Sequence, residues 1–157
     1  MKILIANVGS SSLKCQLLSM PDETVLARAR VERVGSDQAP VEWTDRDGNN
    51  HKEEKPLPDH VTAIQFILDK LCDSDKGVLS STAELNAVGF KPVIAANRIT
   101  GCQYMDDRVL DAMREFSDFV AGLHNKICVK AIESFKSILP DTPMLGLFET
   151  TFFQEWP

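Results

Sequence analysis

One short segment near the start of the chain, Asn-Val-Gly-Ser-Ser-Ser-Leu-Lys, gathers residue types that suit phosphate binding. Gly9 permits a close approach of the backbone, and Ser10 and Ser12 contribute hydroxyl groups beside exposed backbone N–H groups. Lys14 adds an ammonium group. Such donors form a backbone nest with a nearby cation, which binds phosphate without needing a helix N-terminus. Asn7, at the end of an apolar run, offers a carbonyl oxygen that would help to place a hydrated Mg²⁺ ion.

The elements around this segment would place its donors on one side. Residues 2–8 and 13–19 are short apolar-rich runs, and the Gly-Ser-Ser between them predicts the turn of a β-hairpin. Because side chains alternate along a strand, Ser12, Lys14 and Gln16 would share one face. The other face would carry Leu13, Cys15 and Leu17. An ordinary turn with a solvent-facing lysine is the alternative interpretation of so short a pattern.

The composition limits the classes of protein to which the chain can belong. Its 157 residues suffice for one domain of typical size, about 100–150 residues, and 43% hydrophobic content excludes a disordered chain. No apolar run approaches the ~20 residues of a membrane-spanning helix, and no targeting segment is visible. The net charge of −6 argues against a general binder of nucleic acid or of anionic membranes. We therefore expect a cytoplasmic protein.

The cysteines and histidines predict neither disulfides nor a zinc site. Cys15, Cys72, Cys102 and Cys128 show no Cys-x-x-Cys spacing, and each has apolar or helical neighbours. We therefore expect reduced, buried thiols. The three histidines are too scattered in sequence to indicate a zinc site.

The rest of the chain predicts a mixed α/β sheet flanked by helices. An alternating run over 24–34 predicts a third strand, and a turn signal at 47–50 predicts a short strand on each side. Asp59 is the expected cap of a helix near 60–72. The later predicted elements are a loop at 73–82, a strand at 85–90, helices near 107–116 and 126–138, and a strand at 143–149. Strands followed by strand–helix alternation are typical of a mixed α/β fold.

Position and order connect the first segment with a known family. The run Ile-x-Asn-x-Gly-Ser-Ser-Ser-Leu-Lys resembles the N-terminal signature of acetate kinases, which belong to the acetate and sugar kinase, heat-shock 70 and actin superfamily. Residues 89–93 (Gly-Phe-Lys-Pro-Val), 123–125 (Leu-His-Asn) and 148–154 (Phe-Glu-Thr-Thr-Phe-Phe-Gln) resemble further motifs of that family in the same order. The resemblance covers essentially the whole chain.

The resemblance implies a fold, a reaction and a set of site residues. The fold would be an α/β domain of the ribonuclease-H-like (actin-like ATPase) type. The reaction would transfer phosphoryl from ATP to acetate or another short carboxylate, giving acyl phosphate and ADP, with ATP and Mg²⁺ as cofactors. Lys91 and Glu149 would be the catalytic residues. The other implied roles are phosphate binding by Asn7, Ser10, Ser12 and Lys14, substrate binding by Lys91, Val93, Leu123 and His124, and metal placement by Asn7 and Glu149.

Several motif positions depart from the family pattern. Lys91 stands where the family has arginine, and it keeps the charge without the planar fork that binds carboxylate or phosphate bidentately. Glu149 replaces an aspartate and moves the carboxylate outward by one methylene group. The remaining departures are Ile94, Ala95 and Ala96 in place of His-Gly-Gly, Lys126 in place of proline, and Phe153 in place of histidine. The two charge-conserving changes favour a retuned site over decay.

Two interpretations of the whole chain stay open. Acetate kinases are much longer and bind adenosine in a second domain, so residues 1–157 would be an N-terminal acetokinase-like domain, the first half of a two-domain kinase. A C-terminal domain or a homodimer would then complete the site for a carboxylate or acyl phosphate and an adenine nucleotide. The alternative is a non-catalytic module that keeps the fold and binds phosphate, nucleotide or another protein. Lys91 would then be a solvated lysine, Glu149 a strand-end carboxylate, and His124 a contact of a helix's first turn.

Overall fold

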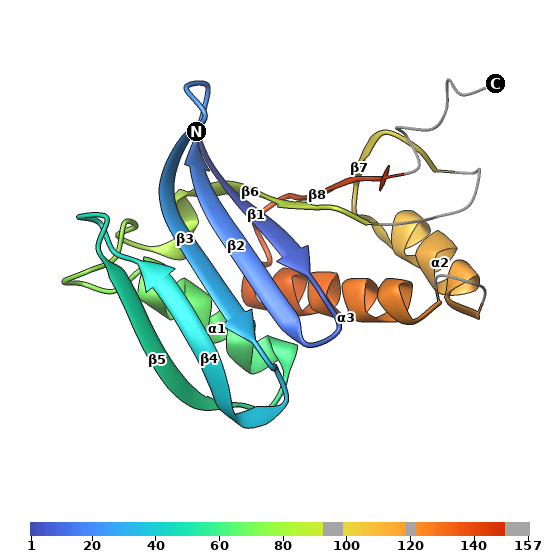
Figure 1. Ribbon diagram of the computed structural model, residues 1–157. Helices are drawn as coiled ribbons and strands as arrows, with labels where there is room; N and C mark the ends of the chain where they lie inside the picture. The colour runs from blue at the N-terminus through green and yellow to red at the C-terminus, as the bar shows by residue number, and fades with distance from the viewer. Residues whose placement is uncertain (93–98, 119–121, 150–157) are drawn as a thin grey trace.

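The first part of the chain folds into an antiparallel meander (Figure 1). The computed structural model describes residues 1–92, 99–118 and 122–149, with all side chains in these ranges except those of residues 118, 122 and 123. The meander comprises β1 (Lys2–Val8), β2 (Ser12–Ser19), β3 (Thr24–Glu32), β4 (Ser36–Thr44) and β5 (Asn50–Leu57). The hairpin, the third strand and the two strands around the 47–50 turn are thereby confirmed.

Strands and helices alternate in the remainder of the chain. The helices are α1 (His60–Leu71), α2 (Asp107–Glu115) and α3 (Gly122–Ile138), with short 3₁₀ turns η1 (Thr82–Glu84) and η3 (Phe116–Asp118). The strands are β6 (Leu85–Phe90), β7 (Cys102–Tyr104) and β8 (Met144–Leu147). Asp59 caps α1 by accepting from the Thr62 N–H at 2.8 Å, as its sequence position predicts. Asp106 caps α2 through the Val109 N–H in the same way.

The sheet is mixed, as expected, with the strand order β5-β4-β3-β2-β1-β6-β8-β7. The pairs β1/β6 and β6/β8 are parallel, whereas the other neighbours are antiparallel. α1 packs against β2, β3 and β5, and α3 packs against β1 and α1. Figure 1 shows α1 and α3 side by side along the sheet.

The core lies between the sheet and these two helices. Ile64, Ile67 and Leu68 face it from α1 at helical spacing and are almost fully buried. Phe135 of α3 meets Phe90 of β6 edge to face, with ring centroids 5.4 Å apart. This packing fixes the strands whose ends carry the predicted site residues. Among the described residues, no helix has both the length and the apolar character needed to cross a membrane.

Three details of the fold differ from the sequence expectations. α3 begins at Gly122, four residues before the predicted start. The prediction began later because polar Asn125 interrupts the apolar pattern. In the structure Asn125 is buried within the helix and donates to the Met113 carbonyl oxygen at 3.2 Å. β7 was not predicted, since three residues are too few to show alternation. β8 ends at Leu147, so Glu149 follows the strand.

The four cysteines are free, but they are not all buried. Cys15 is buried, and burial raises its pKa to about 12. Cys72 and Cys128 are half-buried. Cys102 is exposed because it lies on the edge strand β7, so the expectation of four buried thiols holds fully at Cys15 only and is wrong at Cys102.

Candidate functional site

The predicted site residues lie at or just beyond the carboxyl ends of three neighbouring strands. Because β1, β6 and β8 run parallel, their carboxyl ends lie on the same side of the sheet (Figure 1). Asn7 stands near the end of β1, Lys91 directly follows β6, and Glu149 follows β8. Ligands of open α/β sheets commonly bind outside the carboxyl ends of the strands. The 9–12 turn after β1 therefore opens at the same edge as Lys91 and Glu149.

The 9–12 turn is closed by the Gly9 N–H, which donates to the Ser12 carbonyl oxygen at 2.8 Å. A Cβ atom at residue 9 would lie 2.6 Å from Ser12 Oγ, so a larger residue would displace that hydroxyl group. Glycine thus keeps the Ser12 hydroxyl close to the backbone of the turn. Ser10 is exposed at its tip.

Two carbonyl oxygens of this turn are held by donors from outside it, whereas two of its N–H groups are available. The Gly9 carbonyl oxygen accepts from His60 Nε2 at 3.0 Å, and the Ser11 carbonyl oxygen accepts from the Val34 N–H at 2.9 Å. Within the part of the chain that the structure describes, the N–H groups of Ser10 and Ser11 donate to no acceptor. A phosphate is repelled by carbonyl oxygens and accepts from N–H groups, so this polarity suits an anion.

Asn7 and Lys14 face each other across β1 and β2 on the exposed face of the sheet. Lys14 Nζ lies 3.8 Å from Glu32 Oε1, and the same oxygen accepts from Arg30 Nε at 2.6 Å. Half of the Lys14 side chain remains exposed to solvent. Since an exposed ion pair is typically worth at most ~1 kcal/mol, Glu32 is a weak competitor for a phosphate at Lys14.

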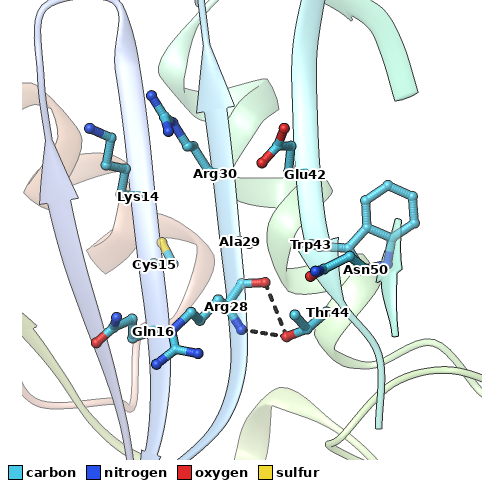
Figure 2. A pocket seen from close by; sticks show the side chains of 10 residues that line it. All are labelled: Lys14, Cys15, Gln16, Arg28, Ala29, Arg30, Glu42, Trp43, Thr44 and Asn50. Carbon is cyan, nitrogen blue, oxygen red and sulfur yellow. Dashed lines mark hydrogen bonds between the residues drawn. The ribbon is translucent and has the colours of Figure 1, made fainter. Parts of the chain in front are cut away.

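Lys14 also lines a shallow hollow of about 400 Å³ on the exposed face of β2, β3 and β4. Figure 2 shows Lys14, Arg30 and Glu42 extending from these neighbouring strands, in the order that the strand register sets. Glu42 is paired with Lys52 at 2.7 Å, and this contact lowers the pKa of Glu42. Two cations, Lys14 and Arg30, stand beside one carboxylate, Glu42, so the row carries charges of both signs. The row therefore lacks the uniform donor character of the 9–12 turn.

Lys91 and Glu149 come from separate motifs and form an ion pair. The Glu149 N–H also donates to the Pro92 carbonyl oxygen at 3.1 Å, which joins the segments that follow β6 and β8. The two side chains are 58% and 38% exposed, so a ligand can reach both. The structure thus brings the two predicted catalytic residues together, with their charges mutually neutralised.

The structure describes only some of the other residues predicted to bind substrate. His124 is exposed within the first turn of α3, so the expectation that it precedes a helix is wrong, because the helix already begins at Gly122. Val93 lies outside the described residues, as does the side chain of Leu123. The motif positions 94–96 and 153 also lie outside them.

The donors for a metal ion are few. Among the described residues, no three His, Cys, Asp or Glu side chains gather closely enough to hold a metal. The predicted pair, Asn7 and Glu149, offers one amide oxygen and one partly exposed carboxylate. Mg²⁺ is usually bound through one or two carboxylates together with substrate phosphates and waters. This sparse donor set fits a Mg²⁺ ion that arrives with a nucleotide.

Two neighbours of the 9–12 turn were missed in the sequence. His60 contacts Gly9 across 51 residues, and no local pattern indicates such a contact. Glu32 pairs with Lys14 because β3 lies beside β2. A strand over 24–34 is predicted from the sequence, and pairing it with the 13–19 strand in the observed register places the Glu32 carboxylate beside Ser12.

Comparisons with known proteins agree along the whole chain. A family model described as the Acetokinase family matches residues 2–157. The acetate kinases of Clostridium kluyveri and Alkaliphilus metalliredigens are 38% and 40% identical over all 157 residues, which cover 38% and 39% of those proteins. The chain thus spans about two-fifths of the length of the curated relatives it matches.

Solved structures give the same result for the fold. The crystal structure of Porphyromonas gingivalis acetate kinase matches with a TM-score of 0.92 and 34% identity, over 99% of this chain and 39% of that one. A propionate kinase from Francisella tularensis matches with a TM-score of 0.87 at 20% identity, over 99% of this chain and 38% of that one. The expected ribonuclease-H-like (actin-like ATPase) fold is confirmed.

Proposed function

Because the chain belongs to the acetokinase family, we propose that it forms one wall of a kinase site that phosphorylates a short carboxylate. A carboxylate oxygen of the acceptor would attack the γ-phosphorus of ATP, and the bond from that phosphorus to the bridging oxygen of ADP would break. The products are an acyl phosphate and ADP. The observation that carries this proposal is the 9–12 turn, whose Gly9 and Ser11 carbonyl oxygens are occupied and whose Ser10 and Ser11 N–H groups have no acceptor in the described structure.

The protein would contribute to this reaction mainly by positioning the reactants and by supplying charge. A phosphoryl transfer passes through a transition state whose charge is spread over the phosphoryl oxygens, so fixed donors lower the barrier. The hydroxyl groups of Ser10 and Ser12, the N–H groups of the turn and the Lys14 ammonium would hold the phosphates. Asn7, opposite Lys14, would orient the metal ion, which when bound offsets charge on the phosphates.

The ion pair between Lys91 and Glu149 would break when substrates bind. The acceptor carboxylate would take the place of the Glu149 carboxylate on Lys91, and Glu149 would then be free to face the metal and its waters. Both residues are open to solvent, which supports such an exchange. From the family resemblance, Val93 and Leu123 would contact the acyl group and His124 would donate a hydrogen bond nearby.

The rest of such a site would come from outside this sequence. The curated relatives are about two and a half times as long as their match to this chain, so we propose an N-terminal acetokinase-like domain of a longer kinase. Four free thiols support a cytoplasmic location. We expect the 157-residue chain to bind phosphates without useful turnover of acetate and ATP. Acyl-phosphate formation at an ordinary rate by the purified chain would show that one chain, or a homodimer, completes the site.

A non-catalytic module is the second candidate function. The observation that favours it is the mutual neutralisation of Lys91 and Glu149, which leaves no net charge at their position. A non-catalytic module would bind phosphate at the 9–12 turn, but acetate would have no effect on the Lys91–Glu149 pair. An acetate titration monitored by NMR at the Glu149 carboxyl carbon separates the two candidates.

The proposed phosphate site is tested by calorimetric titration of pyrophosphate into the 157-residue chain at fixed salt. Lys14→Ala should weaken binding about ten- to a hundredfold, since a charge-assisted contact is worth about 1.5–3 kcal/mol. Lys52→Ala is the matched control, because Lys52 lies on the same face of the sheet and is paired with Glu42, away from the turn. Equal affinities for wild type and Lys14→Ala, with both proteins folded by circular dichroism, would refute the site.

A further inference from the structure

A histidine far away in sequence holds the backbone of the 9–12 turn. His60 is the first residue of α1 and is half-buried, and its Nε2 lies 3.0 Å from the Gly9 carbonyl oxygen. A carbonyl oxygen only accepts, so Nε2 carries the hydrogen and donates it. The Asp59 cap fixes the backbone on which His60 stands, through Thr62 N–H and hydroxyl contacts at 2.8 and 2.9 Å. The donor is therefore mounted on a rigid element.

This hydrogen bond determines where a neighbouring N–H group points. The Gly9 carbonyl and the Ser10 N–H belong to one planar trans peptide group, in which they point in opposite directions. Holding the carbonyl toward His60 therefore turns the Ser10 N–H away from α1. The Val34 N–H likewise holds the Ser11 carbonyl at 2.9 Å, which fixes the Ser11–Ser12 peptide on the other side of the turn. The turn is thus oriented from outside by two donors.

We propose that His60 is a positioning residue that aims the Ser10 N–H at the bound phosphate and withdraws the Gly9 carbonyl oxygen from it. The proposal rests on the proposed function of the 9–12 turn and adds a residue to it. Without His60, the Gly9–Ser10 peptide is free to rotate and to present its oxygen to the anion. A hollow of about 190 Å³ beside Ser10 and His60, between the turn, α1 and α3, leaves room for that rotation.

The test uses three variants of His60 in the 157-residue chain. His60→Leu removes the donor and keeps an apolar side chain of similar bulk. His60→Gln restores a donor, because glutamine Nε2 is separated from Cα by as many bonds as histidine Nε2. His60→Asn carries the same amide one bond closer to the backbone, so it does not reach Gly9. Ile67→Val is the control for stability, since it removes a methylene group from the buried face of the same helix.

Two measurements separate the positioning role from the phosphate site itself. The ¹⁵N order parameter of the Ser10 N–H, measured without ligand, should fall from about 0.85 toward about 0.6 in His60→Leu and stay high in His60→Gln. Calorimetric affinity for pyrophosphate should fall roughly three- to tenfold in His60→Leu and His60→Asn. It should return to near the wild-type value in His60→Gln. Ile67→Val should lower the thermal midpoint and leave both readouts unchanged.

The outcomes are distinct. Unchanged affinity in His60→Leu, with or without a looser turn, would overturn the proposal. So would equal losses in His60→Gln and His60→Leu, because bulk and not the donated hydrogen bond would then matter. Absence of pyrophosphate binding by wild type would refute the phosphate site and, with it, the role of His60 in binding. The order parameters would still show whether His60 fixes the turn.

Discussion

Two turns of the same sheet use their backbone N–H groups in opposite ways. In the 45–49 turn between β4 and β5, the buried Asp45 carboxylate accepts from the N–H groups of Asp47 and Asn49, both at 2.9 Å. It also accepts from His51 Nε2 at 2.8 Å. These contacts, with His51 the strongest, hold the pKa of Asp45 well below its usual range. The turn therefore satisfies most of its own donors.

The 9–12 turn has no such internal acceptor. Its sequence contains glycine and serines only, and the available N–H groups belong to Ser10 and Ser11. A third turn, at residues 73–77, resembles the 45–49 turn, because Asp73 Oδ1 accepts from the Asp75 and Lys76 N–H groups at 2.9 Å. A carboxylate within a turn thus accepts from the N–H groups of that turn, whereas a turn without one leaves N–H donors for an anion from outside.

The largest expected effect comes from giving the 9–12 turn a carboxylate of its own. Ser10→Asp should weaken pyrophosphate binding about a hundredfold or more, because two charges ~4 Å apart near a protein surface repel by up to ~4 kcal/mol. Calorimetry at fixed salt measures the change. Ser10→Asn, which is similar in shape but neutral, should cost far less. If the two variants bind equally, charge in the turn does not decide its role.

The converse substitution removes the Asp45 carboxylate, the acceptor within the 45–49 turn. Asp45→Ala leaves the Asp47 and Asn49 N–H groups and the His51 ring without their shared partner, so the thermal midpoint should fall by several degrees. Pyrophosphate affinity should not change. A variant as stable as wild type would show that water replaces the carboxylate without cost.

A smaller effect is expected beside the open turn. Glu32→Gln removes the carboxylate that pairs with Lys14, so pyrophosphate binding should tighten about two- to fivefold, the range expected for an exposed ion pair. Glu54→Gln is the control, since Glu54 pairs with Arg33 at the surface, at 3.6 Å. Weaker binding in Glu32→Gln would mean that Glu32 orients Lys14 and does not compete for it.

The smallest effect is the acid response of the 73–77 turn. The Lys76 and Asp75 N–H groups lower the pKa of Asp73, so its contribution to stability is complete above the unfolded value of about 3.9. That contribution is lost as the pH falls through the lower folded value. The thermal midpoints of wild type and Asp73→Asn should therefore differ above about pH 4 and converge in stronger acid. A constant difference at every pH would contradict this.

Local patterns predicted the parts of the site that local structure determines. Alternation along 2–8 and 13–19 placed Lys14 on the exposed face, and the cap at Asp59 located the start of α1. Asn125 misled the prediction of α3 because its burial depends on a carbonyl of α2. β7 exists only through its pairing with β8. The contact of His60 with Gly9 joins residues far apart in sequence, so no periodicity could reveal it.

The strand order also has a consequence for the order in which the site forms. The meander from β1 to β5 pairs neighbours in sequence, whereas β1 meets β6 only after a long loop closes, as in the contact of the Lys2 N–H with Asn86 across 84 residues. Local contacts form quickly, and closing a long loop costs entropy that must be spent before its contacts are gained. We therefore expect the 9–12 hairpin to fold early and the Lys91–Glu149 pair to assemble late. Phosphate affinity would then appear during refolding before the carboxylate-binding side of the site exists.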